Sequence, residues 1–394
     1  MLTDWRSFRF ELRFDRDRLR DEIVNIEAYR LSLSKLILPQ HWREDLQKLH
    51  IVRSVHGTTA IEGNPLTEHE VSKQLHEHRQ RARLDQLHRQ TRNAASAFRW
   101  VEQQFQRPCP IRLSDILTIH ELLTKDSDEG DNIPGRLRDS GHNVTVGSPQ
   151  LGGVHHAPPG GTTTAQLLDE FIEFINSASF KAENVVVQAL AAHFYFVTLH
   201  PFGNGNGRAT RCIEAAILYA GGYNTYGFYS LSNYFYRNRD AYFRTLQETR
   251  TPHSYDLTAF LQFGLSGFRA ELDRINAYVR HRTHRLQYRD LIRRCTERRV
   301  GPKRRLLNER EAALLHRLLE LGKPADPFSD AAVREVTLRG DLSAIIGSLY
   351  AHRTDRTMVR ELTRLRELGF IKFEPAATTG DWRALIDFEA IARY

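Results

Sequence analysis

One segment constrains the fold of this chain more than any other: a long apolar run that leads into a glycine-rich loop. The run is Val185–Leu199. It falls short of the roughly 20 residues that cross a bilayer, so it predicts a buried helix and no membrane association. Glycines follow at positions 203, 205 and 207, and a helical pattern resumes at about Arg208. The sequence therefore predicts a buried helix, a tight loop and a second helix.

The loop has the composition of a phosphate-binding site. Glycine accepts positive φ angles and lets the backbone approach a ligand. Amides in such a turn form an anion-binding nest, and the next helix adds its positive N-terminal end. Arg208 and Arg211 share a helix face and can grip a polyphosphate, while His200 at the loop entry can accept a proton. These residues favour transfer of a phosphorus group to a hydroxyl, although a flexible turn with a structural histidine is the plainer reading of the glycines alone.

The complete string resembles the signature of the Fic (filamentation induced by cAMP) family, His-Pro-Phe-x-Asp/Glu-Gly-Asn-Gly-Arg-x-x-Arg. It matches at eight positions: His200, Pro201, Phe202, Gly205, Asn206, Gly207, Arg208 and Arg211. The resemblance covers roughly Leu38–Leu261. It implies a mainly α fold, with a helical core and a small β-hairpin flap within Asp126–Gly161, whose edge can align a target segment by β-addition.

The resemblance also implies an activity: a protein adenylyltransferase that moves AMP from ATP to a Ser, Thr or Tyr hydroxyl of a protein target or of itself. The implied roles by position are general base, His200; loop anchor, Phe202; cradle for the α- and β-phosphates, Gly205, Asn206 and Gly207; and outer phosphates, Arg208 and Arg211. Farther along, Asn238–Leu246 resembles the family's helix beside the adenine. There Tyr242 would pack on the base and Asn238 would bond nearby, although aromatic residues on a helix are more often core.

Asn204 departs from the family pattern, which has Asp or Glu at this position. The family's carboxylate helps to hold Mg²⁺ on the phosphates, and Mg²⁺ prefers such ligands over a neutral carbonyl. We therefore expect Mg²⁺ to be held weakly by Asn204 and mainly by the nucleotide; a catalytically quiet nucleotide binder is the alternative. His155 and His156 are adjacent loop histidines, which are seldom metal ligands.

An upstream segment, Thr58–Asn64, resembles the inhibitory motif of many Fic proteins, Ser/Thr-x-x-x-Glu-Gly/Asn. By this resemblance Glu62 pairs with Arg211 in the place of the γ-phosphate and so blocks productive ATP binding. Thr58 lies four residues earlier on the same helix face, where its hydroxyl can steady the packing against the loop. The alternative is an ordinary helix end at Gly63 with an exposed Glu62.

Periodicity outlines the rest of the chain. Alternation over Phe8–Phe14 predicts a strand, and helical patterns follow as far as about residue 105. We expect three regions: 1–105 with the inhibitory motif, 106–290 as the Fic core, and 300–394. Helical patterns at 308–321, 330–336, 342–351 and 355–368, followed by a hairpin over Ile371–Phe388 turning near Gly380, are typical of a winged helix-turn-helix.

Charge points to a second possible partner. Residues 280–310 contain twelve basic and three acidic residues, which accounts for the chain's whole net charge of +8. Such a block contacts nucleic acid or is a solvated helix followed by a linker. The alternative function is therefore a nucleotide-sensing transcriptional regulator that binds duplex DNA. A homodimer is plausible. Three isolated cysteines and a charged N-terminus without a signal peptide favour the cytoplasm.

Overall fold

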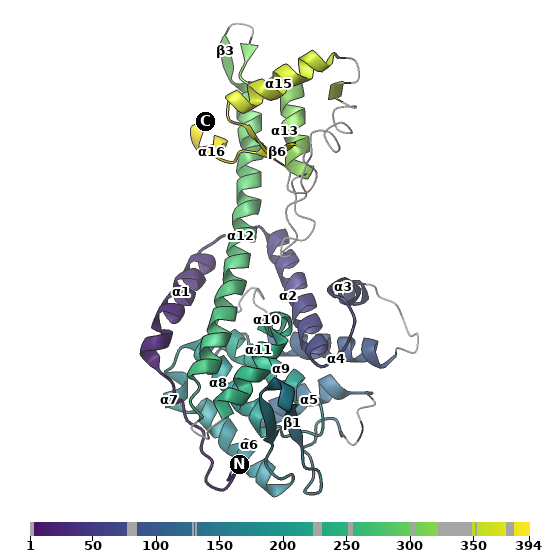
Figure 1. The fold of residues 1–394 in the computed structure, drawn as a ribbon, viewed down its shortest axis with the longest axis vertical. Helices are drawn as coiled ribbons and strands as arrows, with labels where there is room; N and C mark the ends of the chain where they lie inside the picture. Colours follow the sequence, from purple (N-terminus) through teal and green to yellow (C-terminus); the bar gives the residue numbers. More distant parts are fainter. Residues whose placement is uncertain are drawn as a thin grey trace. The chain divides into compact units, whose positions relative to one another are not determined.

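A computed structural model describes residues 4–76, 85–127, 130, 132–223, 231–250, 255–301, 304–321, 349–350, 353–375 and 382–394. The chain divides into two compact units, Met1–Asp273 and Arg274–Tyr394. The described residues are mainly helical with short strands, as predicted (Figure 1). None of the helices among them is long and apolar enough to span a membrane. The limits 105/106 and 290/300 stay a prediction.

The first unit is built around one buried helix. Its elements are α1 (Arg16–Ser34), α2 (Gln40–Ile61), α3 (Glu68–His76), α4 (Gln86–Gln104), α5 (Leu113–Thr124), β1 (Thr145–Ser148), η1 (Pro149–Leu151), β2 (Gly153–His156), α6 (Thr162–Asn176), α7 (Ala178–Lys181), α8 (Val185–Leu199), α9 (Asn206–Ala220), α10 (Leu231–Arg237), α11 (Arg239–Arg250) and the start of α12 (Thr258–Glu297). Every residue of α8 after Val185 is buried, because the run is apolar on all sides. α9 packs along α8 (Figure 1).

Helix α2, which carries the inhibitory motif at its C-terminal end, packs closely on α10. Gly57 permits the approach, since an added Cβ would lie 2.6 Å from the backbone nitrogen of Asn233. One turn earlier, Arg53 forms an ion pair of 3.2 Å with the buried Glu271 of α12, which also pairs with Arg237 of α10 at 3.1 Å. Backbone packing and buried charge thus fix α2 within the first unit.

The predicted strand at Phe8–Phe14 is wrong. Side chains there do alternate between buried or half-buried and exposed, but the segment runs across helices. Its backbone is bonded by the Tyr195 hydroxyl, which donates to Glu11 O at 2.6 Å, and by Leu257 N–H, which donates to Arg13 O at 2.8 Å. Alternation reports one-sided burial, and a helical surface provides it as well as a sheet does.

The predicted loop-and-hairpin region contains the expected hairpin, here called the flap (145–156). β1 and β2 pair antiparallel, with Thr145 opposite His156 and Ser148 opposite Gly153. Glycine is needed at the turn: Gly152 and Gly153 have φ of 93° and 133°, and an added Cβ on Gly147 would lie 2.5 Å from Gly153 O. The short strands and the positive-φ glycines define a tight, strongly bent hairpin.

The second unit has its own apolar core, formed by side chains such as Leu291, Leu315, Leu365 and Phe370. Its elements are the rest of α12, β3 (Arg299–Gly301), β4 (Arg304–Arg305), α13 (Glu309–Leu321), α15 (Asp355–Glu367), β5 (Ile371–Pro375), β6 (Trp382–Ile386) and α16 (Ala390–Arg393). The C-terminal hairpin is confirmed, because β5 pairs antiparallel with β6. The helical patterns at 330–336 and 342–348 and the turn at Gly380 lie outside the described residues, so the winged helix stays a prediction.

Candidate active site

The glycine loop connects two helix ends. α8 ends at His200, whose left-handed conformation (φ 49°, ψ 58°) turns the chain sharply. α9 begins at Asn206, after Gly205 at φ 74°, two residues earlier than expected. The first amides of a helix have no partner within it and lie at its positive end. The loop therefore presents the amides of Asn206 and Gly207 where a phosphate can bind.

The Asn206 side chain holds the loop closed and is not itself free for phosphate. Its Oδ1 accepts from Phe202 N–H and its Nδ2 donates to Phe202 O, both at 2.9 Å. Phe202 is fully buried and stacks on His120 of α5, with 3.7 Å between the ring centroids. His120 in turn donates from Nε2 to the backbone oxygen of Asn204 at 3.0 Å. His120 was not foreseen, because nothing in the sequence connects α5 to the loop.

His200 is prepared as a base. Its Nδ1 lies 3.0 Å from Val197 O. Since a carbonyl only accepts, Nδ1 carries the proton, and neutral imidazole then has its lone pair on Nε2. Burial, together with the charges of Arg250 and Arg138, lowers the pKa of His200 to about 4, although the bond to Val197 and the Glu62 carboxylate oppose the shift. The imidazole is therefore neutral at physiological pH.

The C-terminal end of α8, from which His200 emerges, is capped by side chains from other segments. Arg138 donates from Nε to His200 O at 2.8 Å and from Nη2 to Pro158 O at 2.5 Å. His155 of the flap donates from Nε2 to Thr198 O at 2.9 Å, and burial lowers its pKa to about 3. The bonds to His200 O and Thr198 O satisfy carbonyls that a helix end leaves open. His155 therefore ties the flap to the last turn of α8.

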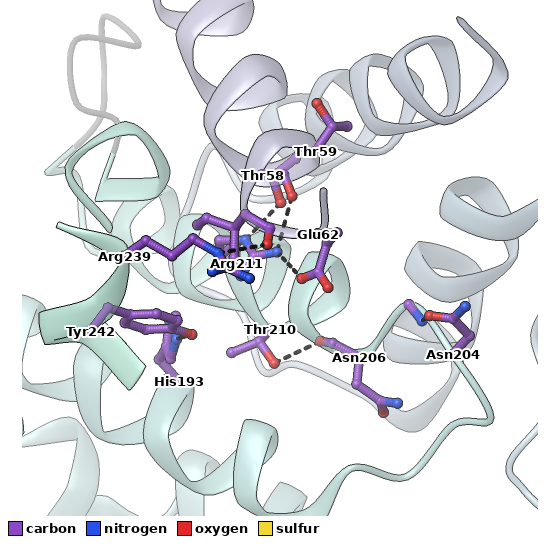
Figure 2. A network of polar contacts seen from close by, with 12 residues as sticks. Thr58, Thr59, Glu62, His193, Asn204, Asn206, Thr210, Arg211, Arg239 and Tyr242 are labelled. Carbon is purple, nitrogen blue, oxygen red and sulfur yellow. Dashed lines mark hydrogen bonds and ion pairs between the residues drawn. The ribbon is translucent and has the colours of Figure 1, made fainter. Parts of the chain in front are cut away.

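Arg211 is held by the C-terminal turn of α2. Its Nε donates to Thr58 Oγ1 at 2.7 Å, and its Nη2 donates to Thr58 O at 3.1 Å and to Glu62 Oε1 at 2.6 Å. Figure 2 shows Arg211 reaching from α9 to both residues. We call Thr58, Glu62 and Arg211 the latch. Partial burial raises the pKa of Glu62, but Arg211 and Arg208 outweigh it and hold the pKa below its usual value.

Arg208 occupies a different environment from Arg211, although the two are three residues apart. Both are buried. Arg211 lines the cavity, whereas Arg208 is not one of its lining residues; an added Cβ on Gly205 would lie 3.5 Å from Arg208 Nη2. Both guanidiniums nevertheless act on Glu62, because the charges of Arg211 and Arg208 each lower the pKa of its carboxyl group.

One cavity brings most of the candidate residues together. Its lining comes from the end of α2, the flap, the end of α8 with the glycine loop, and α11: Ile61, Glu62, Val146, Gly147, Leu151, Gly153, Val197, His200, Asn204, Gly205, Asn206, Gly207, Arg211, Tyr242, Phe243, Leu246, Gln247 and Arg250. Tyr242 is among them. Asn238 is not: it is exposed, and its Nδ2 donates to Tyr234 O at 3.0 Å.

The Tyr242 hydroxyl belongs to a buried network that sequence reasoning missed. It lies 2.8 Å from His193 Nε2, and His193 Nδ1 lies 2.5 Å from Glu214 Oε2. Because a carboxylate accepts, His193 donates from Nδ1 and accepts the tyrosine proton at Nε2. We call Tyr242, His193 and Glu214 the brace. His193 had the one visible signal, a polar residue inside an apolar helix.

The donors at the cavity do not form a metal site of their own. Asn204 Oδ1 already accepts Gly205 N–H at 2.6 Å. Within the described parts of the chain, no group of three or more His, Cys, Asp or Glu could hold a metal ion. A single neutral oxygen is a poor set for Mg²⁺, which favours carboxylates and phosphate oxygens. Weak metal binding by Asn204 stays a prediction.

Comparison with known proteins agrees with this geometry. Residues 110–218 match the model of the Fic/DOC family. The chain is 25% identical over 212 residues to the protein adenylyltransferase Fic of Drosophila willistoni. The aligned region covers 51% of this chain and 38% of that protein. For the protein of the same name from Drosophila grimshawi, identity is 30% over 127 residues, with 32% and 24% covered. The chain thus spans well under half the length of these relatives.

Solved structures share the fold. A Fic family protein from Desulfovibrio desulfuricans aligns with a TM-score of 0.54 at 19% identity, over 94% of this chain and 95% of that one. Fic-1 from C. elegans aligns with a TM-score of 0.51 at 20% identity, over 65% of this chain and 71% of that one. At this identity the likeness shows the fold alone.

Proposed function

We propose that this chain is a protein adenylyltransferase, which transfers AMP from ATP to a hydroxyl side chain of a protein target or of itself. One observation carries the proposal: a neutral His200 with its Nε2 lone pair available lines the same cavity as the amide cradle of α9 and Arg211. A base beside an anion site is the requirement for activating an alcohol next to a polyphosphate.

The reaction would proceed by displacement at the α-phosphorus. The hydroxyl oxygen of the target attacks this phosphorus while His200 Nε2 takes the hydroxyl proton. The bond from the α-phosphorus to the oxygen bridging to the β-phosphate breaks, and pyrophosphate leaves with that bonding pair. The Asn206 and Gly207 amides stabilise the phosphate charge. The exposed edge of the flap would align the target strand by β-addition.

The latch supports autoinhibition. Glu62 Oε1 bonds to the guanidinium that would otherwise meet the outer phosphates. It also lies beside the cradle, since an added Cβ on Gly207 would be 2.2 Å from it. A carboxylate there repels the polyphosphate and occupies its space. The Thr58 hydroxyl serves the latch by accepting from Arg211, in keeping with the steadying role expected for it.

ATP is proposed to enter as its Mg²⁺ complex, with the phosphates providing most of the metal's ligands. Mg²⁺ on the nucleotide neutralises phosphate charge. Asn204→Asp would add a carboxylate, so we expect it to increase self-modification with labelled ATP at limiting Mg²⁺. Equal activity of the two proteins across a Mg²⁺ titration would contradict a role for residue 204 in metal binding.

The deciding experiment follows label from α-³²P-ATP into protein, with the Glu62→Gly variant and a cell lysate. We expect labelled bands that disappear with Glu62→Gly/His200→Ala, a loss on the order of 10²–10⁴-fold. Glu62→Gly/His41→Ala is the control, because His41 is exposed on α2. Label from γ-³²P-ATP instead would indicate phosphate transfer. Label that does not depend on His200 would overturn the proposal.

A second candidate, binding of duplex DNA by the second unit, has a specific observation in its favour. Residues 274–394 contain 25 basic and 16 acidic residues, against 31 and 32 in residues 1–273. On α15, Arg356 and Arg360 are exposed on one face. Arg364 is not available, because it pairs with the buried Glu311. Within the predicted basic block, Arg293 and Arg294 both pair with Asp290, as in a solvated helix.

DNA binding would be tested with the full chain and a labelled duplex. We expect a mobility shift that weakens steeply as salt rises, because phosphate contacts release counterions. Arg360→Gln should weaken it, whereas Arg317→Gln, an exposed arginine of α13, is the matched control. Equal binding by both variants would exclude α15 as the contact. Homodimerisation stays a prediction, and the three free cysteines suit the proposed cytoplasmic location.

A further inference from the structure

Arg250, the last residue of α11, lies at the cavity and has no part in the family signature. Its guanidinium is almost fully buried, with 7% of the residue exposed, and it lines the same cavity as His200. Nε donates to Thr198 Oγ1 at 3.1 Å, and Nη2 lies 3.4 Å from Val197 O. Both acceptors belong to the last turn of α8. Burying a guanidinium is costly unless its N–H groups are hydrogen-bonded. At this position the two acceptors on α8 call for a side chain with several donors, which arginine provides.

Arg250 and His200 share one oxygen atom. Val197 O accepts from His200 Nδ1 at 3.0 Å and also accepts from Arg250 Nη2 at 3.4 Å. The orientation of this carbonyl decides which imidazole nitrogen carries the proton. Arg250 is bonded on both sides of that peptide, at Val197 O and at Thr198 Oγ1, and so restrains it.

We propose that Arg250 is a positioning residue for His200, which fixes the Val197 carbonyl and thereby keeps Nε2 as the acceptor that faces the reaction. This inference rests on the proposed transfer reaction. It adds a residue of α11 to the machinery of a loop that lies between α8 and α9. The tautomer of the base would then depend on a helix some 50 positions along the chain.

The charge of Arg250 acts in the same direction. Four charged or titratable groups face His200: Arg250 from α11, Glu62 from α2, Arg138 ahead of the flap, and His155 from β2. Burial is the main cause that lowers the His200 pKa to about 4; Arg250 and Arg138 lower it further, whereas Glu62 raises it. Burial also lowers the pKa of Arg250, to about 10, so this group remains a cation at neutral pH. Removal of Arg250 should therefore raise the pKa of His200.

The test combines a titration with kinetics, all in the Glu62→Gly background so that the contribution of Glu62 is absent from every variant. Proteins with ¹⁵N-labelled histidine are titrated by NMR, and the His200 signals are assigned by their loss in His200→Asn. Arg250→Gln should raise the His200 pKa by about one unit, a tenfold change in proton affinity. Arg250→Lys retains the charge and should keep the pKa low. Arg92→Gln, an exposed arginine of α4, is the control.

Kinetics separate positioning from other roles. With Arg250→Gln we expect kcat at pH 8 to fall about tenfold, because the base is less well oriented. The acid limb of the pH–rate profile should move upward and the KM for ATP should stay within twofold. Arg250→Lys should lower kcat without moving the acid limb of the pH–rate profile. A raised KM with an unmoved limb would identify Arg250 as a nucleotide contact, and an unchanged His200 pKa with an unchanged kcat would overturn the proposal.

The NMR titration needs no turnover, so the two proposals fail separately. Folding of each variant is checked by its histidine spectrum. If Arg250→Gln does not fold, Arg250→Lys and the titration of the parent protein still decide. A neutral parent His200 whose ¹⁵N signals place the proton on Nε2 instead of Nδ1 would overturn the positioning role. A displaced pKa with no label transfer in any variant would overturn the reaction and leave the positioning role intact.

Discussion

Two sets of polar contacts in the first unit are alike in chemistry and differ in their access to solvent. The latch joins α2 to α9 through Glu62 and Arg211, and the brace joins α9, α8 and α11 through Glu214, His193 and Tyr242. Each ends in a glutamate that bonds to a basic side chain at 2.5–2.6 Å. The Glu62 side chain is 38% exposed, however, while that of Glu214 is 4% exposed.

Solvent access decides what it costs to open each contact. When the latch opens, water hydrates the Glu62 carboxylate, and the buried Arg211 keeps its bonds to Thr58 Oγ1 and Thr58 O. When the brace opens, a polar group stays buried without a partner and the desolvation penalty is not recovered. Under the proposed function, a nucleotide replaces Glu62 as the partner of Arg211. The brace, by contrast, stays bonded and holds three helices together.

Loss of the brace should have the largest effect. Glu214→Ala removes the acceptor of His193 Nδ1 in the core, and we expect the free energy of unfolding to fall by about 2–3 kcal/mol. Glu248→Ala, an exposed glutamate of α11, should change it by less than about 0.5 kcal/mol. Urea denaturation followed by circular dichroism measures both. Equal stability of the two variants would mean that the brace is not a stabilising element.

Loss of the latch should change activity more than stability. Glu62→Gly frees Arg211 and the space beside Gly207, and we expect AMP transfer to rise about tenfold or more, which corresponds to about 1.4 kcal/mol of activation free energy. Glu62→Gln keeps the volume of the side chain but not its charge, so AMP transfer should rise less than in Glu62→Gly. Glu44→Gln, exposed on the same helix, is the control. If Glu62→Gly gained nothing over the parent protein, the latch would not inhibit.

A smaller effect is expected from the packing that supports the latch. Gly57→Ala puts a Cβ 2.6–2.7 Å from backbone atoms of Ser232 and Asn233, so α2 must shift away from α10. Overpacking of this kind costs about 1–3 kcal/mol, and the displaced Glu62 should raise AMP transfer a few-fold. Gly141→Ala, where an added Cβ meets nothing within 4 Å, is the control. Lower stability without a gain in transfer would separate α2 packing from inhibition.

The smallest effect concerns pH. A depressed carboxyl pKa makes a contribution that is present above the usual value of 4.5 and is lost as pH falls through the folded value. The latch is therefore closed throughout pH 6–8. The ratio of Glu62→Gly to parent activity should stay constant within about twofold over this range, because its carboxylate does not titrate there. A ratio that approaches one toward pH 6 would show protonation of Glu62 and contradict the ion pair.

Local signals account for what the sequence predicted well. The apolar run of α8 and the glycines of the loop each act over a few neighbouring residues, so pattern and composition were sufficient. The strand expected at Phe8–Phe14 failed for the opposite reason. Alternation shows that one side is buried but not what buries it, and here Tyr195 and Leu257 bond the backbone.

Long-range contacts account for the site residues that the sequence did not predict. Arg138, His120 and Arg250 hold His200 and its loop from segments distant in the chain, and an isolated arginine or histidine in a sequence carries no sign of its partner. The shared role expected for Arg208 and Arg211 stays a prediction, because helix periodicity places both on one face without showing their surroundings. That rule describes one helix and not what packs on it.

By itself, the sequence determined the chemistry available to this protein: a histidine, a run of glycine amides and two arginines within twelve residues of one another, with a glutamate on an upstream helix. Only the tertiary structure decided which of these groups meet and in what state. Burial makes His200 neutral, Val197 O selects its tautomer, and α2 brings Glu62 to Arg211. The physical reason is that protonation and ion pairing depend on desolvation and distance in space, neither of which is a property of neighbouring residues in a chain.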